Sequence, residues 1–253
     1  MHITLTGNLG SGKSTICKIL ESEHHYEIYS TGKVQRKLAE DLGISVLEMN
    51  QLMCKDHKYD NMIDDTTAKI SRENPDKAIV FDSRLAWNFV EKSFKVFLSV
   101  SLDVAARRVY GDNRGNVEKY SSIEDAKQQL KLRAQTEDIR YKDIYNLDYF
   151  NFSNYNLILD STCCTPKLLS KVILEEAKKY SENSESRGTK ILMSPKRLGI
   201  DDAIISEHPE KLYLEGDIVI EKTEDDYKVI QGMELVKQAA KEGIPLVSVT
   251  LFG

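Results

Sequence analysis

A glycine-rich segment near the amino terminus constrains this chain more than any other feature. Residues 7–15 read Gly-Asn-Leu-Gly-Ser-Gly-Lys-Ser-Thr, which satisfies the phosphate-binding pattern GxxxxGK(S/T). An apolar run at residues 3–6 precedes the segment and a helix-like stretch at 13–23 follows it, as the pattern requires. The glycine spacing is not the GxGxxG of dinucleotide-binding proteins. The segment therefore predicts a P-loop between a strand and a helix.

The residue types in this loop suit a triphosphate. Glycines let the backbone turn tightly and point N–H groups at phosphate oxygens, and the following helix adds the positive end of its dipole. Lys13 is placed to reach the β and γ phosphates, and Ser14 to complete a Mg²⁺ shell. We therefore expect ATP and Mg²⁺ as cofactors, Lys13 as a catalytic group and Ser14 as a metal ligand. The expected ATP-binding residues are Gly7, Gly10, Ser11, Gly12, Lys13, Ser14 and Thr15.

Apolar runs alternate with helical stretches over the first 180 residues, which predicts a parallel sheet with helices on both faces. The expected strands are 3–6, 27–30, 78–81, 96–100 and 157–159. The expected helices are 13–23, 33–42, 58–73, 103–109, 122–146 and 166–178. The fold class is therefore α/β, with a P-loop NTPase-type sheet.

A polar stretch near 179–189 predicts a linker between two domains, 1–180 and 189–253, although a long surface loop is the alternative. Beyond it, residues 216–221 and 227–230 predict a hairpin. A helix is expected over 233–241 and a last strand over 246–251. The second domain is thus predicted to be a small α+β unit.

Charge and composition exclude several classes. With 35 basic and 40 acidic residues the net charge is −5, which argues against a protein that coats nucleic acid. No apolar run approaches the length of a membrane helix, and the first residues lack the features of a signal peptide. The four cysteines have no metal-ligand spacing. We expect a reduced, cytoplasmic protein without a membrane or nucleic-acid partner.

The remaining motifs narrow the type of P-loop protein. An NKxD-type guanine reader and an apolar run ending in Asp-Glu are both missing, which argues against a GTPase switch and a motor-like ATPase. A small-molecule kinase needs a phosphate cradle, an acceptor pocket and arginines that close over the phosphoryl group. Arg36 and Arg84 both follow strand ends, where ligands bind in such sheets. Arg133 and Arg140 share one helix face, where they could equally be solvated or paired with carboxylates.

The chain up to about residue 175 resembles the archaeal-type cytidylate kinase family of P-loop nucleoside monophosphate kinases. The resemblance rests on the P-loop, on Ser30-Thr31-Gly32 followed by Arg36, on residues 82–87 (Asp-Ser-Arg-Leu-Ala-Trp) and on residues 155–160. It rests most on Arg133, Glu137, Arg140-Tyr141, Tyr145 and Asp148, which recur in register. Ser83 in place of a glycine and the absence of a glycine before Trp87 depart from the family pattern. The resemblance also implies a helical lid, whose stretch at 111–120 is longer and more polar here than is usual in the family.

The resemblance implies transfer of the γ-phosphoryl group of ATP to CMP or dCMP. It implies that Arg133 and Arg140 clamp the transferring group, with help from Arg108, and that the acceptor is bound by Thr31, Gly32, Arg36, Asp82 and Arg84. The role of Asp82 stays open between base, outer Mg²⁺ ligand and acceptor for a cytosine hydrogen bond. The alternatives are a kinase of another small acceptor, or an ATP-binding regulatory protein whose C-terminal domain binds a partner.

The C-terminal unit resembles the small ParB-like fold more weakly. The match is Tyr227 to Gly232, a helix containing Ala239-Ala240, and residues 243–247. The phosphate-binding Gly-x-Arg-Arg of that family is here Gly232-Met233-Glu234-Leu235. Acidic residues also outnumber basic ones in this unit, which disfavours DNA. An adaptor, dimerisation or regulatory role remains, beside a purely stabilising one.

Overall fold

The computed structural model describes residues 1–44, 46–55, 58–111, 120–182, 188–206, 209–223 and 226–252. The strands are β1 (His2–Gly7), β2 (Glu27–Ser30), β3 (Ile79–Asp82), β4 (Ser93–Ser99), β5 (Leu157–Asp160), β6 (Lys190–Met193), β7 (Tyr213–Leu214), β8 (Val219–Lys222), β9 (Tyr227–Gln231) and β10 (Leu246–Leu251). The helices are α1 (Lys13–His24), α2 (Thr31–Asp41), α3 (Val46–Lys55), α4 (Lys58–Glu73), α5 (Ala86–Phe89), α6 (Leu102–Gly111), α7 (Ile123–Tyr145), α8 (Pro166–Glu182) and α9 (Met233–Lys241), with a 3₁₀ turn at Phe152–Asn154.

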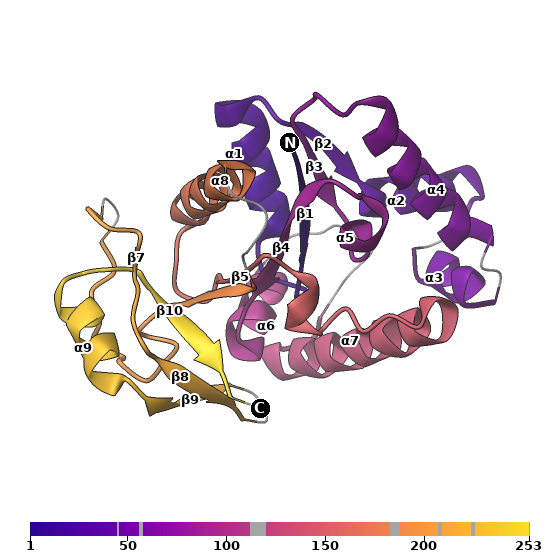
Figure 1. Ribbon diagram of the computed structural model, residues 1–253. Coiled ribbons are helices and arrows are strands. Elements are labelled where there is room, and N and C mark those ends of the chain that lie inside the picture. Colours follow the sequence, from indigo (N-terminus) through magenta and orange to yellow (C-terminus); the bar gives the residue numbers. More distant parts are fainter. Residues whose placement is uncertain are drawn as a thin grey trace.

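The strands form one sheet in the order β2-β3-β1-β4-β5-β6-β10-β8-β9, with β7 beside β10 (Figure 1). From β2 to β6 all neighbours are parallel. Parallel neighbours need crossover helices, and these cover both faces of the sheet. The α/β fold with a mostly parallel sheet is confirmed.

The two faces of the sheet carry different apolar clusters. Ile3 and Leu5 of β1 pack with Leu20 of α1 and Leu169 of α8 on one face. Phe97 of β4 packs on the other face, with Trp87 of α5 and Tyr141 of α7. Figure 1 shows α1 and α8 side by side, across the sheet from α5 and α7. Because side chains alternate along a strand, buried strands like β4 supply both clusters.

The sheet does not end where the linker was expected. Helix α8 extends to Glu182, and β6 then pairs parallel with β5, with Ile158 opposite Ile191. The residues that follow join the same two apolar clusters, through Leu192 and Leu246 on one face and Ile218 and Val236 on the other. The described residues from 190 onward therefore extend the first sheet and contribute to its two apolar clusters.

Most expected elements are present with small shifts, and four of the described helices and strands were missed. The expected strand 96–100 begins at Ser93, and the expected helix 33–42 begins at Thr31. Helix α3 was missed, as were strand β6 and the short α5 and β7. The lid stretch at 112–119 lies outside the described residues. In the part of the chain that is described, no helix is both long and apolar enough to cross a membrane.

Candidate nucleotide-binding site

The P-loop is packed so closely that two of its positions accept only glycine. Gly7 has φ +146°, and a Cβ there would lie 2.3 Å from the Leu98 carbonyl oxygen. Gly10 has φ +75°, and its Cβ would lie 2.9 Å from the Ala105 Cα. A side chain would therefore clash with backbone that cannot move aside. The loop is held between β4 and α6 in a fixed shape.

Helix α1 begins at Lys13, directly after Gly12 in a left-handed conformation. The first N–H groups of a helix have no partner within it, so they are available to an anion. The Lys13 ammonium donates to the carbonyl oxygens of Gly7 at 3.0 Å and Asn8 at 3.2 Å. Burial and the nearby Arg84 guanidinium lower the pKa of Lys13 to about 7. A bound phosphate would relieve this by supplying a counter-charge.

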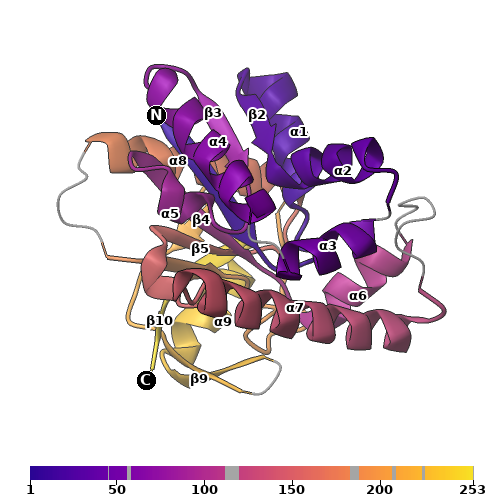
Figure 2. The same ribbon diagram turned by 90° about the vertical axis from the view of Figure 1, so that its right-hand side faces the viewer.

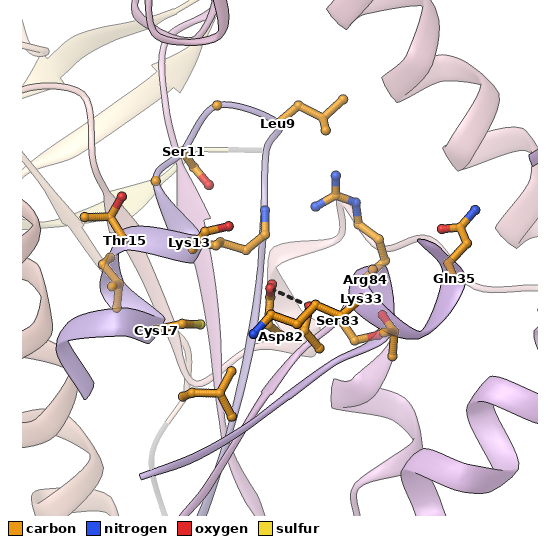
Figure 3. Close-up of a pocket in the computed structure, with 18 of the residues that line it drawn as sticks. Leu9, Ser11, Lys13, Thr15, Cys17, Lys33, Gln35, Asp82, Ser83 and Arg84 are labelled. Carbon is orange, nitrogen blue, oxygen red and sulfur yellow. Dashed lines mark hydrogen bonds between the residues drawn. The ribbon is translucent and has the colours of Figure 1, made fainter. Parts of the chain in front are cut away.

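A cavity of about 850 Å³ opens at the carboxyl ends of the strands, beside this loop. Figure 3 shows Lys13, Asp82 and Arg84 around one opening. Of the predicted residues, those that line the cavity are Gly10, Ser11, Gly12, Lys13, Ser14, Thr15, Thr31, Gly32, Asp82, Arg84, Arg108, Arg133 and Arg140. Gly7 is not among the lining residues, and the side chain of Arg36 lies outside the described part of the chain. Residues far apart in sequence thus converge on one site.

One carboxylate joins two of the predicted arginines. Glu137 on α7 accepts a hydrogen bond from Arg84 Nε at 2.9 Å and from Arg133 Nε at 3.1 Å. Burial opposes the charged form of Glu137, but the two guanidiniums outweigh it and its pKa is lowered. Arg84 also donates to the Gly7 carbonyl oxygen at 2.8 Å. Arg84 therefore links β3, the P-loop and α7.

Arg108 lies on the other side of the P-loop. Its guanidinium donates to the carbonyl oxygens of Gly10 at 3.3 Å and Ser161 at 2.7 Å. Burial lowers its pKa. Arg108 thus ties the P-loop to the turn after β5, whose residues Ser161, Cys164 and Pro166 line the same cavity.

The far end of the cavity, between α4 and α7, carries two carboxylates that were not expected there, those of Asp60 and Asp64. Arg140 lies 3.9 Å from the Asp60 carboxylate, and Tyr145 donates a hydrogen bond to Asp64. Burial raises the pKa of Asp64 to about 6. Apolar walls come from Met53 and Ile63. The signal available in the sequence was the spacing of Asp60 and Asp64, four apart on one helix face.

The donor set near the P-loop suits Mg²⁺ brought in with phosphates. The Ser14 side chain and the Asp82 carboxylate both line the cavity, and Ser30 Oγ donates to Asp82 at 3.1 Å. Hard oxygen ligands of this kind, few in number, leave places for phosphate oxygens and water. Among the described residues, no group of three or more His, Cys, Asp or Glu side chains could hold a metal unaided. The residues therefore fit a magnesium ion that shares its shell with a nucleotide.

The fold and the site together define a P-loop α/β protein with a cavity of nucleotide size. The chain belongs to the cytidylate kinase-like family, whose family model matches residues 2–163. It is 30% identical over 178 residues to a cytidylate kinase of Methanobrevibacter smithii, covering 70% of this chain and 99% of that protein. It is 34% identical over 187 residues to a cytidylate kinase of Haloarcula marismortui, covering 73% and 93%.

One further relative and one solved structure are also similar to this chain. A nucleotide dehydratase of Lacinutrix mariniflava that depends on S-adenosylmethionine is 31% identical over 186 residues, which cover 72% of this chain and 37% of that protein. A crystal structure of an uncharacterized protein from Eubacterium ventriosum matches with a TM-score of 0.52 at 12% identity, covering 70% of this chain and 98% of that one. The structural likeness supports the fold alone.

Proposed function

We propose that the chain transfers the γ-phosphoryl group of MgATP to CMP or dCMP. The observation that carries the proposal is the convergence of the P-loop with Arg84, Arg108, Arg133 and Arg140 on one cavity, in a member of the cytidylate kinase-like family. Guanidinium forks bind phosphate oxygens in pairs and stabilise the charge of the transferring group. The α4 end is left for the acceptor nucleoside.

The residues divide into three roles in this proposal. The backbone of residues 7–15 and Lys13 hold the donor phosphates, and Ser14 with Asp82 would hold Mg²⁺, which neutralises phosphate charge. Arg36 and Arg84 hold the acceptor phosphate. Arg133 and Arg140 clamp the transferring group from α7. Since Arg84 and Arg133 are paired with Glu137, phosphates share these guanidiniums with a carboxylate that already orients them.

A monophosphate acceptor suits a site in which no general base is needed. The second pKa of a phosphate monoester is near 6, so the attacking oxygen is already charged at neutral pH. The carboxylates of Asp60 and Asp64 at the far end of the cavity can accept hydrogen bonds from an amino group. Cytosine presents such a donor at N4, and uracil presents an acceptor in its place. This difference supports a cytidine acceptor.

The test is a coupled ADP-release assay over a panel of nucleoside monophosphates, with MgATP as donor. We expect CMP and dCMP to have the highest kcat/KM. If no monophosphate stimulates ADP release while ATP still binds, the proposal is wrong and a regulatory ATP-binding role takes its place. A kinase of a hydroxyl acceptor would instead release ADP in the same assay when a sugar or another small alcohol replaces the monophosphate.

For the C-terminal part we propose a ParB-like arrangement with an adaptor or dimerisation role. It is supported by the succession of hairpin β8–β9, helix α9 and strand β10, with Gly232 left-handed at the start of the helix. Size-exclusion chromatography with light scattering tests dimerisation, and a monomer at high protein concentration would contradict it. We also propose a cytoplasmic location, which is supported by the free thiols of Cys17, Cys163 and Cys164.

A further inference from the structure

Arg197 is a buried cation in the segment that follows β6. Its side chain is 5% exposed, and its Nη1 donates to Asp160 Oδ1 and to Thr162 Oγ1, both at 2.7 Å. Its Nε donates to Asp226 Oδ1 at 2.7 Å, and its guanidinium lies over the Tyr227 ring at 5.3 Å from the centroid. The guanidinium therefore joins the hairpin β8–β9 to the end of β5.

The two residues that Arg197 holds on the β5 side define the turn after that strand. Asp160 is fully buried, and its Oδ1 also accepts from the Thr162 hydroxyl at 2.6 Å and from the Thr162 N–H at 3.2 Å. Thr162 Oγ1 in turn accepts from the Ser101 N–H at 3.0 Å. With no cation opposite it, a buried carboxylate is unfavourable and the turn would rearrange to hydrate it. Arg197 is thus the charge partner that fixes this turn.

The turn leads directly to the P-loop. The Ser161 and Thr162 carbonyl oxygens accept from Arg108 Nη2 at 2.7 and 3.4 Å, and Arg108 Nη1 donates to the Gly10 carbonyl oxygen at 3.3 Å. A continuous set of hydrogen bonds therefore runs from Asp226 through Arg197, the turn and Arg108 to the phosphate-binding loop. Figure 2 shows the C-terminal strands against the end of the sheet that carries β5. The acceptor end of the cavity, at α4, contributes no atom to this set.

Arg197 lies outside residues 2–163, the part of the chain that the family model matches. The match to the Methanobrevibacter smithii relative is 178 residues long and covers 99% of that protein. The contacts of Arg197 are therefore made by a part of this chain that adds to the family's kinase region. The Arg197–Asp160 pair is buried, whereas Asp226 is half exposed. The added part therefore contacts the kinase region through a buried ion pair as well as through apolar packing.

We propose that Arg197 is a positioning residue for the ATP side of the site: it holds the Asp160–Thr162 turn and, through Arg108, the P-loop. The C-terminal part thereby completes the donor-nucleotide site of this kinase. The inference rests on the proposed function only in taking ATP as the donor. It predicts that loss of the Arg197 contacts weakens ATP binding and leaves acceptor binding unchanged.

The test measures binding of a non-hydrolysable MgATP analogue by calorimetry, together with the KM values for ATP and CMP, in the full chain. Thr162→Val removes the hydroxyl between Arg197 and Asp160 while keeping the side-chain shape. The pair Arg197→Met with Asp160→Asn removes both charges, so that neither is left buried alone. We expect about tenfold weaker analogue binding in both, because small displacements in a preorganised site are costly. The KM for CMP at saturating ATP should change less than about twofold.

Two controls separate positioning from general stability. Lys196→Met removes a cation from the neighbouring position, for which the described part of the chain shows no bond to Asp160 or Thr162, and should bind the analogue normally. Arg197→Lys keeps the charge and should restore part of the lost affinity. Unchanged affinity in the folded double variant overturns the inference, and so does an equal loss for ATP and CMP. If the double variant does not fold, Arg197→Lys decides: wild-type affinity for the analogue in that variant overturns the inference, because an ammonium cannot reproduce the guanidinium fork that bonds Asp160, Thr162 and Asp226 together. If the wild-type chain binds the analogue but phosphorylates no monophosphate, the proposed function is wrong. The calorimetric comparison of analogue binding still tests the role of Arg197 in that case.

Discussion

Arg84 donates to Glu137 across the cavity at 2.9 Å, so that the end of β3 is bonded to the middle of α7. Both side chains are largely buried, at 17% and 14% exposure. Because Glu137 also accepts from Arg133, a single anion balances two cations that the family resemblance assigned to different phosphates. Glu137 therefore keeps the arginines close together before any substrate binds.

Replacing Glu137 by glutamine should destabilise the protein and make its stability depend on bound anions. The variant leaves two guanidiniums close together without a carboxylate, and breaking a buried ion pair costs about 3–5 kcal/mol. Thermal unfolding should show a lower Tm for Glu137→Gln, and added phosphate or CMP should raise it more than in wild type. Glu124→Gln, an exposed position at the start of the same helix, is the matched control. Equal stabilisation of both variants by phosphate would contradict this account.

Binding of ATP should take up a proton at Lys13. The pKa of this ammonium is lowered to about 7 without substrate, and triphosphate oxygens favour its charged form. Below pH 7 the group is protonated in both states, so ATP affinity should be flat there and should fall as pH rises above 7. Calorimetry at pH 8 in buffers of different ionisation enthalpy measures the uptake.

Lys13→Met should abolish both the proton uptake and most of the ATP affinity. Lys69, which is exposed on α4 and does not line the cavity, provides the control Lys69→Met, which should retain both. ATP binding to wild type at pH 8 without proton uptake would show that Lys13 is already charged in the free protein.

Gly10→Ala should lose ATP binding and stability together. The added Cβ would lie 2.9 Å from both the Cα and the carbonyl oxygen of Ala105, at a φ of +75° that disfavours any side chain. We expect a loss of about 1–3 kcal/mol in the free energy of unfolding. Gly188→Ala, where a Cβ meets nothing within 4 Å, should stay within about 0.5 kcal/mol of wild type. Denaturant unfolding measures both, and equal losses would rule out the close packing of the loop as the cause.

The sequence predicted the parts of the site that depend on short patterns. The P-loop could be located from glycine spacing, and the shared face of Arg133 and Arg140 from the helical period. Arg197 could not be found in this way, because its partners Asp160 and Asp226 come from two different strand ends. The continuity of the sheet was equally hidden. A polar stretch ahead of residue 190 predicts a boundary whether or not the next strand returns to the same sheet.

The acceptor end of the cavity was not predicted, for a related reason. In the sequence Asp60 and Asp64 form an ordinary acidic helix face, and they line the cavity only because α7 packs opposite them in the fold. Burial raises the pKa of Asp64 to about 6, so the folded protein holds its proton more tightly than the unfolded chain does. Stability contributed by this group therefore falls as pH rises from about 4 to 6 and is constant above. Asp64→Asn removes this titration. Between pH 4 and pH 6 the free energy of unfolding of wild type should therefore fall by about 1–3 kcal/mol relative to that of the variant.

The same variant should also lose base selectivity, because an amide at this position can donate to the uracil O4 as well as accept from cytosine N4. Kinetics with CMP and UMP at pH 7.5 should show a smaller ratio of kcat/KM values for Asp64→Asn than for wild type, with the KM for ATP unchanged. Asp65→Asn, exposed on the next position of α4, should keep the wild-type ratio and pH dependence. If the ratio stays constant while the stability shift occurs as described, Asp64 is a partly buried carboxylate with a structural role, and other residues of the cavity recognise the cytosine.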